Sequence, residues 1–238
     1  MALGHYQAVL MISMNYIVFI LVALAADYYP RLAAVIHNPQ AAQRTVNLQA
    51  EIILLLSGPM LVGTVALAPW LVPLLFSSEF LPAVEILRWQ ILGDLMKIAC
   101  STLAFILLAA GHGRAYVAVE IMGSAIFVGV TALALNWVGP IAPGIAYFAM
   151  YSVYSVVVLV LARRSIAYVP SRPVIEAFLA VSAALVITVL AASFSPVGGA
   201  IAGVVLGAAI AMLAARRLHH ALPEPLARIA GWIVRAKR

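Results

Sequence analysis

The stretch "ILRWQILGDLMKIACSTLAFILLAA", residues 86–110, is almost entirely apolar. An α-helix rises about 1.5 Å per residue, so about 20 apolar residues cross a hydrocarbon layer about 30 Å thick. This stretch nevertheless contains a carboxylate, Asp94, and an ammonium group, Lys97. It therefore predicts a membrane-spanning helix that carries charge near its middle.

The rest of the chain has the same apolar character. Of its 238 residues, 66% are hydrophobic and 9% are charged, and the mean hydropathy is +1.11. A soluble domain has about 25% charged residues, and a core of this size could not hide so much apolar surface. We therefore predict an all-α integral membrane protein. Its predicted transmembrane helices, which nearly exhaust the chain, are residues 5–26, 52–76, 86–110, 115–136, 141–162, 174–193 and 197–215.

Basic residues fall on alternate loops between these segments. The loops at 27–51, 111–114 and 163–173 and the C-terminal tail contain arginines, and the loops between them contain none. By the positive-inside rule, the basic loops and the C-terminus are predicted to be cytoplasmic and the N-terminus periplasmic. The basic tail fits a membrane surface better than nucleic acid.

The chain divides into three predicted parts. Residues 1–165 form the main unit of five helices, and residues 166–218 add two more. Residues 219–238 form a basic cytoplasmic tail, which is either a short interfacial helix or a frayed end.

Two predicted helices carry packing signals. In the last one, small residues recur every four positions, which predicts close approach of a neighbouring helix; they are Gly199, Gly203, Gly207, Ala211 and Ala215. The second contains three prolines, which remove intrahelical hydrogen bonds; they are Pro59, Pro69 and Pro73. These prolines indicate either a hinge or a fixed bend.

Helical geometry sorts the polar residues of the 86–110 segment. At about 100° per residue, one face collects Gln90, Asp94, Lys97 and Ser101. Glu85 and Arg88 share another face, and Glu120 lies in the next helix.

Charges inside a membrane are retained where they are paired or face protein or water. Asp94 and Lys97 thus form either an intrahelical pair, which fixes the rotation of the helix, or part of the polar wall of a water-filled cavity.

Motifs for catalysis are missing from the sequence. It has no G-x-S-x-G, P-loop or H-E-x-x-H motif, and its five histidines are scattered at loops and ends. Its single cysteine, Cys100, lies in an apolar segment, so neither a disulfide nor a metal cluster is expected within one chain. We expect no enzyme activity and no cofactor.

Four stretches resemble the O-antigen translocases, which are polysaccharide flippases of the multidrug/oligosaccharidyl-lipid/polysaccharide (MOP) exporter superfamily. They are "AADYYPRLAAV" (25–35), "VNLQAEIILLLSGP" (46–59), "LAPWLVPLLFSSEFLPAVEILRWQILGDLMKI" (67–98) and "LLAAGHGRAY" (107–116). The resemblance covers about residues 1–165, and the last two helices match only in position. It implies the C-terminal lobe, plus two additional helices, of a MATE-like two-lobed transporter. Because members of the family are roughly twice as long, the chain corresponds to the C-terminal half only.

The resemblance implies translocation of an undecaprenyl-diphosphate-linked oligosaccharide, such as an O-antigen repeat unit, across the bacterial inner membrane. Arg88 and Lys97 would attract the diphosphate, and Gln90, Asp94 and Ser101 would complete the cavity wall. Arg31 and Arg114 would lie at the cytoplasmic mouth, and ion coupling would involve Asp94, Glu85 or Glu120.

The expected partners are the lipid-linked oligosaccharide, membrane lipids, and a polysaccharide polymerase or the missing N-terminal lobe, with no nucleic acid. The alternatives are a lipid II flippase or a drug exporter of the same superfamily, or a membrane subunit that does not transport. A cationic drug would prefer an acidic cavity without Arg88 and Lys97, which disfavours the drug exporter.

Overall fold

A computed structural model describes residues 2–218, including all of their side chains except those of residues 2, 3, 15–20 and 23–25. Within residues 2–218 the chain forms α-helices and two short 3₁₀ turns, with no strand. The elements are α1 (Ala2–Val35), α2 (Pro39–Leu75), η1 (Ser78–Phe80), α3 (Ala83–Ala109), α4 (Gly113–Val138), η2 (Gly139–Ile141), α5 (Ala142–Ile166), α6 (Arg172–Phe194) and α7 (Pro196–Leu218).

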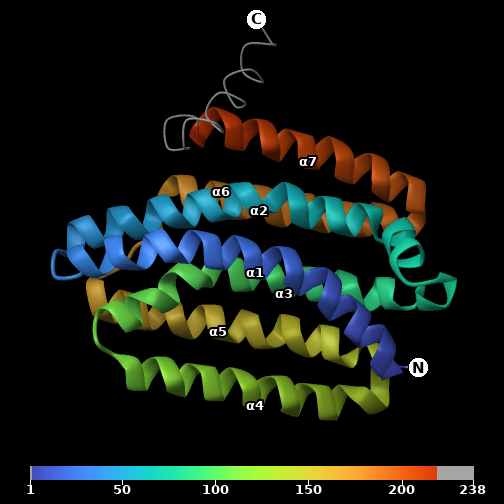
Figure 1. The fold of residues 1–238 in the computed structure, drawn as a ribbon, viewed down its shortest axis with the longest axis horizontal. Coiled ribbons are helices and arrows are strands. Elements are labelled where there is room, and N and C mark those ends of the chain that lie inside the picture. The colour runs from blue at the N-terminus through green and yellow to red at the C-terminus, as the bar shows by residue number, and fades with distance from the viewer. Residues whose placement is uncertain (1, 219–238) are drawn as a thin grey trace, which may run out of the picture.

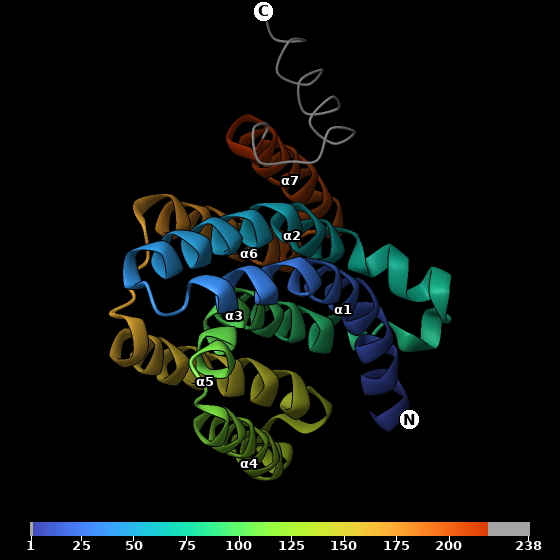
Figure 2. The same cartoon turned by 60° about the vertical axis from the view of Figure 1, so that its left-hand side comes forward.

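The helices run along one common direction and form a bundle (Figure 1). The helix α3 lies at the centre, where it packs on α5, α2 and α1. On one side α6 and α7 pack against α2, and on the other α4 packs mainly against α5 (Figure 2). The added helices α6 and α7 therefore extend the bundle on the side away from α4.

Several of the described helices can cross a membrane by length and composition. Five stretches qualify, and one of them, Gly113–Ile166, contains both α4 and α5. The lengths and compositions of these helices confirm the all-helical, multi-pass architecture. The count of seven spans, which includes residues 5–26, stays a prediction.

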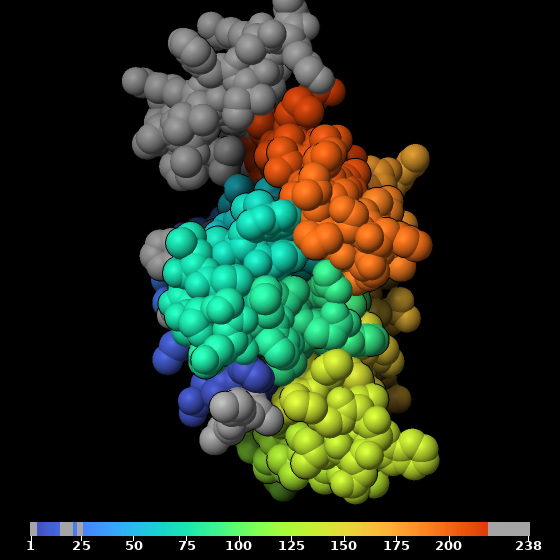
Figure 3. All heavy atoms as spheres, turned by 90° about the vertical axis from the view of Figure 1, so that its right-hand side faces the viewer, coloured from blue at the N-terminus to red at the C-terminus, as the bar shows by residue number. Residues whose placement is uncertain are grey.

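The predicted basic loops lie together at one end of the bundle. The α1–α2, α3–α4 and α5–α6 connections and the C-terminal end of α7 all lie at the left in Figure 1. Figure 3 looks onto the opposite end, which is formed by the α2–α3, α4–α5 and α6–α7 connections. This clustering is what the positive-inside rule requires. Which end is cytoplasmic stays a prediction.

The small residues of α7 lie against its neighbours, as the sequence predicts. Gly203 contacts Ala66 of α2, and Gly199 contacts Ala192 of α6, so tightly that a Cβ atom would clash at either glycine. The helix α2 is continuous from Pro39 to Leu75 and shows no break at its internal prolines. The choice between a hinge and a fixed bend stays a prediction.

The α5–α6 connection, residues 167–171, is held by side chains of α2. The Asn47 Nδ2 donates to the Val169 carbonyl at 3.1 Å. The Asn47 Oδ1 accepts from the Tyr168 hydroxyl at 3.0 Å and from the Ser171 N–H at 2.8 Å. Burial raises the pKa of Tyr168 to about 12, which keeps its hydroxyl a donor at neutral pH. One asparagine thus fixes the start of α6 against α2.

Candidate functional site

Asp94 joins three helices. Its side chain is completely buried in α3. One carboxylate oxygen accepts from the Ser13 hydroxyl of α1 at 2.7 Å, and the other from the Tyr147 hydroxyl of α5 at 2.9 Å. Among the described residues no ion pair joins Asp94 to Lys97. The intrahelical pair therefore does not form, because donors from two other helices hold the carboxylate.

Two glycines allow α3 and α5 to approach this closely. A Cβ atom on Gly93 of α3 would lie 3.1 Å from the Phe148 amide nitrogen and would also collide with the Tyr147 ring. A Cβ atom on Gly144 of α5 would lie 2.9 Å from the Ile86 carbonyl oxygen. Real Cβ atoms rarely come so near backbone, so the glycines set the helix separation that brings the Tyr147 hydroxyl to Asp94.

Three tyrosines of α5 form a row, which we call the tyrosine row: Tyr147, Tyr151 and Tyr154. Successive ring centroids are 4.8 and 5.8 Å apart. Each tyrosine contacts one charged group. Tyr147 donates to Asp94, Tyr154 donates to the Glu120 carboxylate at 2.8 Å, and the Lys97 ammonium lies 5.5 Å from the Tyr151 centroid. The row thus positions two carboxylates and one cation within the helical bundle.

Two cavities flank the tyrosine row. The first, of about 160 Å³, lies between α1, α3, α4 and α5 and is lined by Lys97, Ser101 and Glu120 together with tyrosine side chains. The second, of about 360 Å³, lies between α1, α4 and α5. Glu120, Tyr151 and Tyr154 line both. We call these two spaces together the central cavity.

The predicted polar face of α3 divides into two parts. Lys97 and Ser101 line the central cavity, whereas Gln90 and Asp94 are fully buried in helix packing. Neither amide atom of Gln90 has a hydrogen-bond partner among the described residues.

Arg88 and Glu85 share a separate face, as predicted, and are joined at 2.8 Å. Arg88 also donates to the Ala192 carbonyl of α6 at 3.3 Å, so it points away from Lys97.

The arginines predicted for the cytoplasmic mouth lie at the basic end of the bundle. Arg31 is paired with Asp27 at 2.6 Å, and Arg114 is exposed in the first turn of α4. Neither lines the central cavity. Within residues 2–218 no three His, Cys, Asp or Glu side chains gather to hold a metal ion. The predicted tail, 219–238, lies outside the described residues.

Sequence reasoning did not identify the tyrosine row, although its signal is present. In "YFAMYSVY", residues 147–154, the tyrosines stand at i, i+4 and i+7, which is one helix face. Ser13 carries no such signal, because it is 81 residues from Asp94 and meets it only through folding.

The N-terminal part of the chain has a known counterpart. Residues 1–85 match the model of a family described as polysaccharide biosynthesis protein. The match covers α1, α2, η1 and the start of α3, and so includes Ser13 and the α1 wall of the central cavity. It supports the relationship to polysaccharide flippases at a coarse level, and with it a role in polysaccharide biosynthesis or transport. Searches of curated proteins and of solved structures found no match.

Proposed function

We propose that the chain translocates an undecaprenyl-diphosphate-linked oligosaccharide across the bacterial inner membrane, as the C-terminal half of a flippase. The observation that carries this proposal is the central cavity. It combines an ammonium group, a carboxylate and tyrosine hydroxyls between apolar helices. The polysaccharide biosynthesis match over residues 1–85 supports the substrate class.

Lys97 is the cation suited to the diphosphate. It lines the cavity and, among the described residues, forms no ion pair, so its charge is available to a ligand. A charge-assisted hydrogen bond to a phosphate oxygen offsets the cost of removing that oxygen from water. Arg88 is already neutralised by Glu85 and is therefore secondary. Glu120 and the tyrosine hydroxyls offer partners for sugar hydroxyls.

The cavity is one side of a larger site. The Glu120 side chain is exposed even though the Tyr154 hydroxyl donates to it. This side of the cavity is therefore open to an opposite wall. In a two-lobed flippase the other lobe would supply that wall, and alternating access would rock one lobe against the other. Asp94 is the proposed coupling group, since a proton on its carboxylate would change the tie between α1, α3 and α5.

The test is a translocation assay in vesicles that contain a purified two-lobed flippase of which this chain forms the C-terminal half, together with a fluorescent undecaprenyl-diphosphate-linked trisaccharide. Dithionite added outside bleaches only outer-leaflet fluorophores, so it reports movement between leaflets. We expect Lys97→Ala to slow translocation about tenfold or more, as expected for losing one charge-assisted hydrogen bond. Lys97→Arg keeps the charge and is expected to retain most of the rate.

Arg163→Ala is the matched control, because it removes an exposed basic residue at the end of α5, outside the central cavity. Its rate is expected to equal that of the wild type. Two results would contradict the proposal: wild-type vesicles no faster than protein-free vesicles, or Lys97→Ala as fast as wild type in correctly inserted protein.

A further inference from the structure

A polar cavity at the basic end of the bundle lies outside the proposed translocation site. It has a volume of about 580 Å³ and lies between the first turns of α2 and the α5–α6 connection. Gln40, Gln43, Arg44 and Asn47 line one side of it, and Val169 and Ser171 line the other. The hydrogen bonds of Asn47 to residues 168–171 hold the two sides together. The cavity is therefore built into the fold.

Charge at this cavity favours an anion. The Arg44 side chain is exposed and, among the described residues, has no acidic partner. The helices α2 and α6 both begin beside the cavity, which places the positive ends of two helix dipoles near it. Glu51 is the acidic residue in the lining, and Arg217 lies 3.5 Å from its carboxylate.

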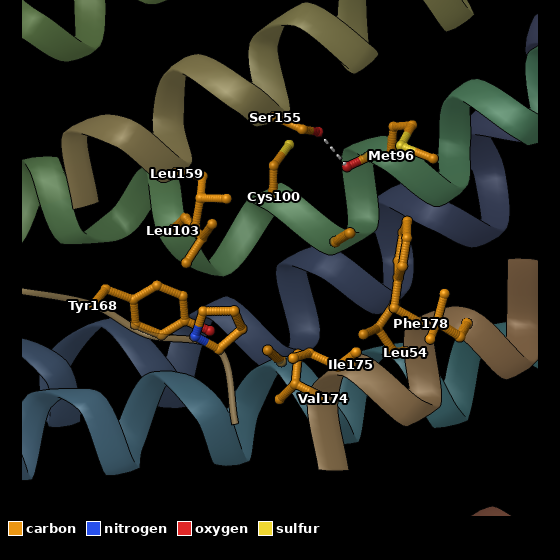
Figure 4. Close-up of a pocket in the computed structure, with 14 residues that line it drawn as sticks. Leu54, Met96, Cys100, Leu103, Ser155, Leu159, Tyr168, Val174, Ile175 and Phe178 are labelled. Atoms are coloured by element: carbon orange, nitrogen blue, oxygen red, sulfur yellow. Dashed lines mark hydrogen bonds between the residues drawn. The ribbon is translucent and has the colours of Figure 1, made fainter. Parts of the chain in front are cut away.

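An apolar groove adjoins the polar cavity at Pro170, which lines both. The groove has a volume of about 220 Å³ and lies between α2, α3, α5 and α6. Figure 4 shows Leu54, Leu103, Leu159 and Phe178 around it. Ser155 also lines it, but its hydroxyl donates to the Met96 carbonyl at 3.2 Å, so it needs no ligand. The groove suits a hydrocarbon chain.

The surroundings of the two spaces match the boundary between lipid headgroups and acyl chains. Leu48 and Val169 are 45% and 62% exposed beside Arg44. Ile175 and Leu179 are 44% and 59% exposed at the groove. Exposed apolar side chains next to a free cation are typical of a surface that meets anionic lipid.

We propose that this pair of spaces binds an anionic phospholipid. The phosphate lies beside Arg44 in the polar cavity, and one acyl chain lies in the apolar groove. The lipid would then pack α6 against α2 and α5 at the basic end. Arg44 lies outside the central cavity, and the groove shares only Cys100 with it. The inference is therefore independent of translocation, because its test changes Arg44 and Leu179 and leaves the central cavity intact.

The test is calorimetric titration of the purified full chain in detergent with dioctanoyl phosphatidylglycerol and dioctanoyl phosphatidylcholine. We expect the anionic lipid to bind about five- to tenfold more tightly, since one basic residue near an anionic headgroup is worth about 1 kcal/mol. Arg44→Gln is expected to abolish this preference. Arg163→Gln, which removes the same charge at the same end but outside both spaces, is expected to preserve it.

Leu179→Trp fills the groove from its exposed side. It is expected to weaken the binding of both lipids while keeping the ratio of their dissociation constants. Ile175→Trp repeats this test should the first variant fold poorly. Glycerol 3-phosphate, which has the charge without the chains, is expected not to displace phosphatidylglycerol. Equal binding of the two lipids by the wild type, equal losses in Arg44→Gln and Arg163→Gln, or displacement by glycerol 3-phosphate would overturn the proposal.

Discussion

Replacing Gly93 by leucine is expected to separate α3 from α5 and to lower the free energy of unfolding by about 3 kcal/mol or more, at the upper end for overpacked cores. A side chain here collides with the Tyr147 ring and with the Phe148 backbone. The backbone cannot rotate away as a flexible side chain can. Moving α5 also withdraws the Tyr147 hydroxyl from Asp94 and leaves the buried carboxylate with one donor fewer. Two penalties therefore add at one position.

Gly129→Leu is the matched control for this variant. Gly129 lies within α4, and a Cβ atom there finds no atom within 4 Å. The same change is expected to alter stability by less than about 0.5 kcal/mol, as at other uncrowded surface positions. Thermal unfolding in detergent, followed by circular dichroism, measures both variants. Equal loss of stability in the two would show that leucine is disfavoured at these helical glycines in general, and that Gly93 does not set the α3–α5 distance.

Features that depend on one helix alone could be predicted from the sequence. The period of 3.6 residues places Glu85 and Arg88 on one face of α3, and the structure joins them. The same period places the small residues of α7 on one face, where they contact α2 and α6. Basic residues alternate from one loop to the next along the chain. Because consecutive helices of an up-and-down bundle run in opposite directions, all the basic loops lie at the same end.

Features that depend on a partner helix could not be predicted in this way. The i, i+3 spacing allows Asp94 to reach Lys97, but the sequence does not show that Ser13 and Tyr147 lie within 3 Å of that carboxylate. Those donors occupy both oxygens of Asp94, and Lys97 extends instead toward Tyr151 and the cavity. The role of Gly93 was hidden for the same reason, since an isolated helical glycine shows its packing partner only in three dimensions.

The two parts of the α3 polar face therefore have different physical roles. Asp94 is fully buried and holds three helices together, whereas Lys97 places its charge at a cavity. A single helical stripe suggested one cavity wall, because sequence spacing gives direction around the helix axis but not the distance to the neighbouring helices. The tyrosine row connects the two parts, since Tyr147 contacts Asp94 and its neighbour Tyr151 contacts Lys97.

The double variant Ser13→Ala with Tyr147→Phe removes both donors to Asp94. It is expected to lower the free energy of unfolding by about 3–5 kcal/mol, since it leaves a buried carboxylate without a partner. Adding Asp94→Leu is expected to recover most of this loss, because no buried acceptor then needs a donor. Ser182→Ala is the control, since its hydroxyl donates only within its own helix, to Phe178. Thermal unfolding of the purified variants in detergent measures each step. A triple variant as unstable as the double would assign the loss to packing around Tyr147, and not to the tie that Asp94 makes between α1, α3 and α5.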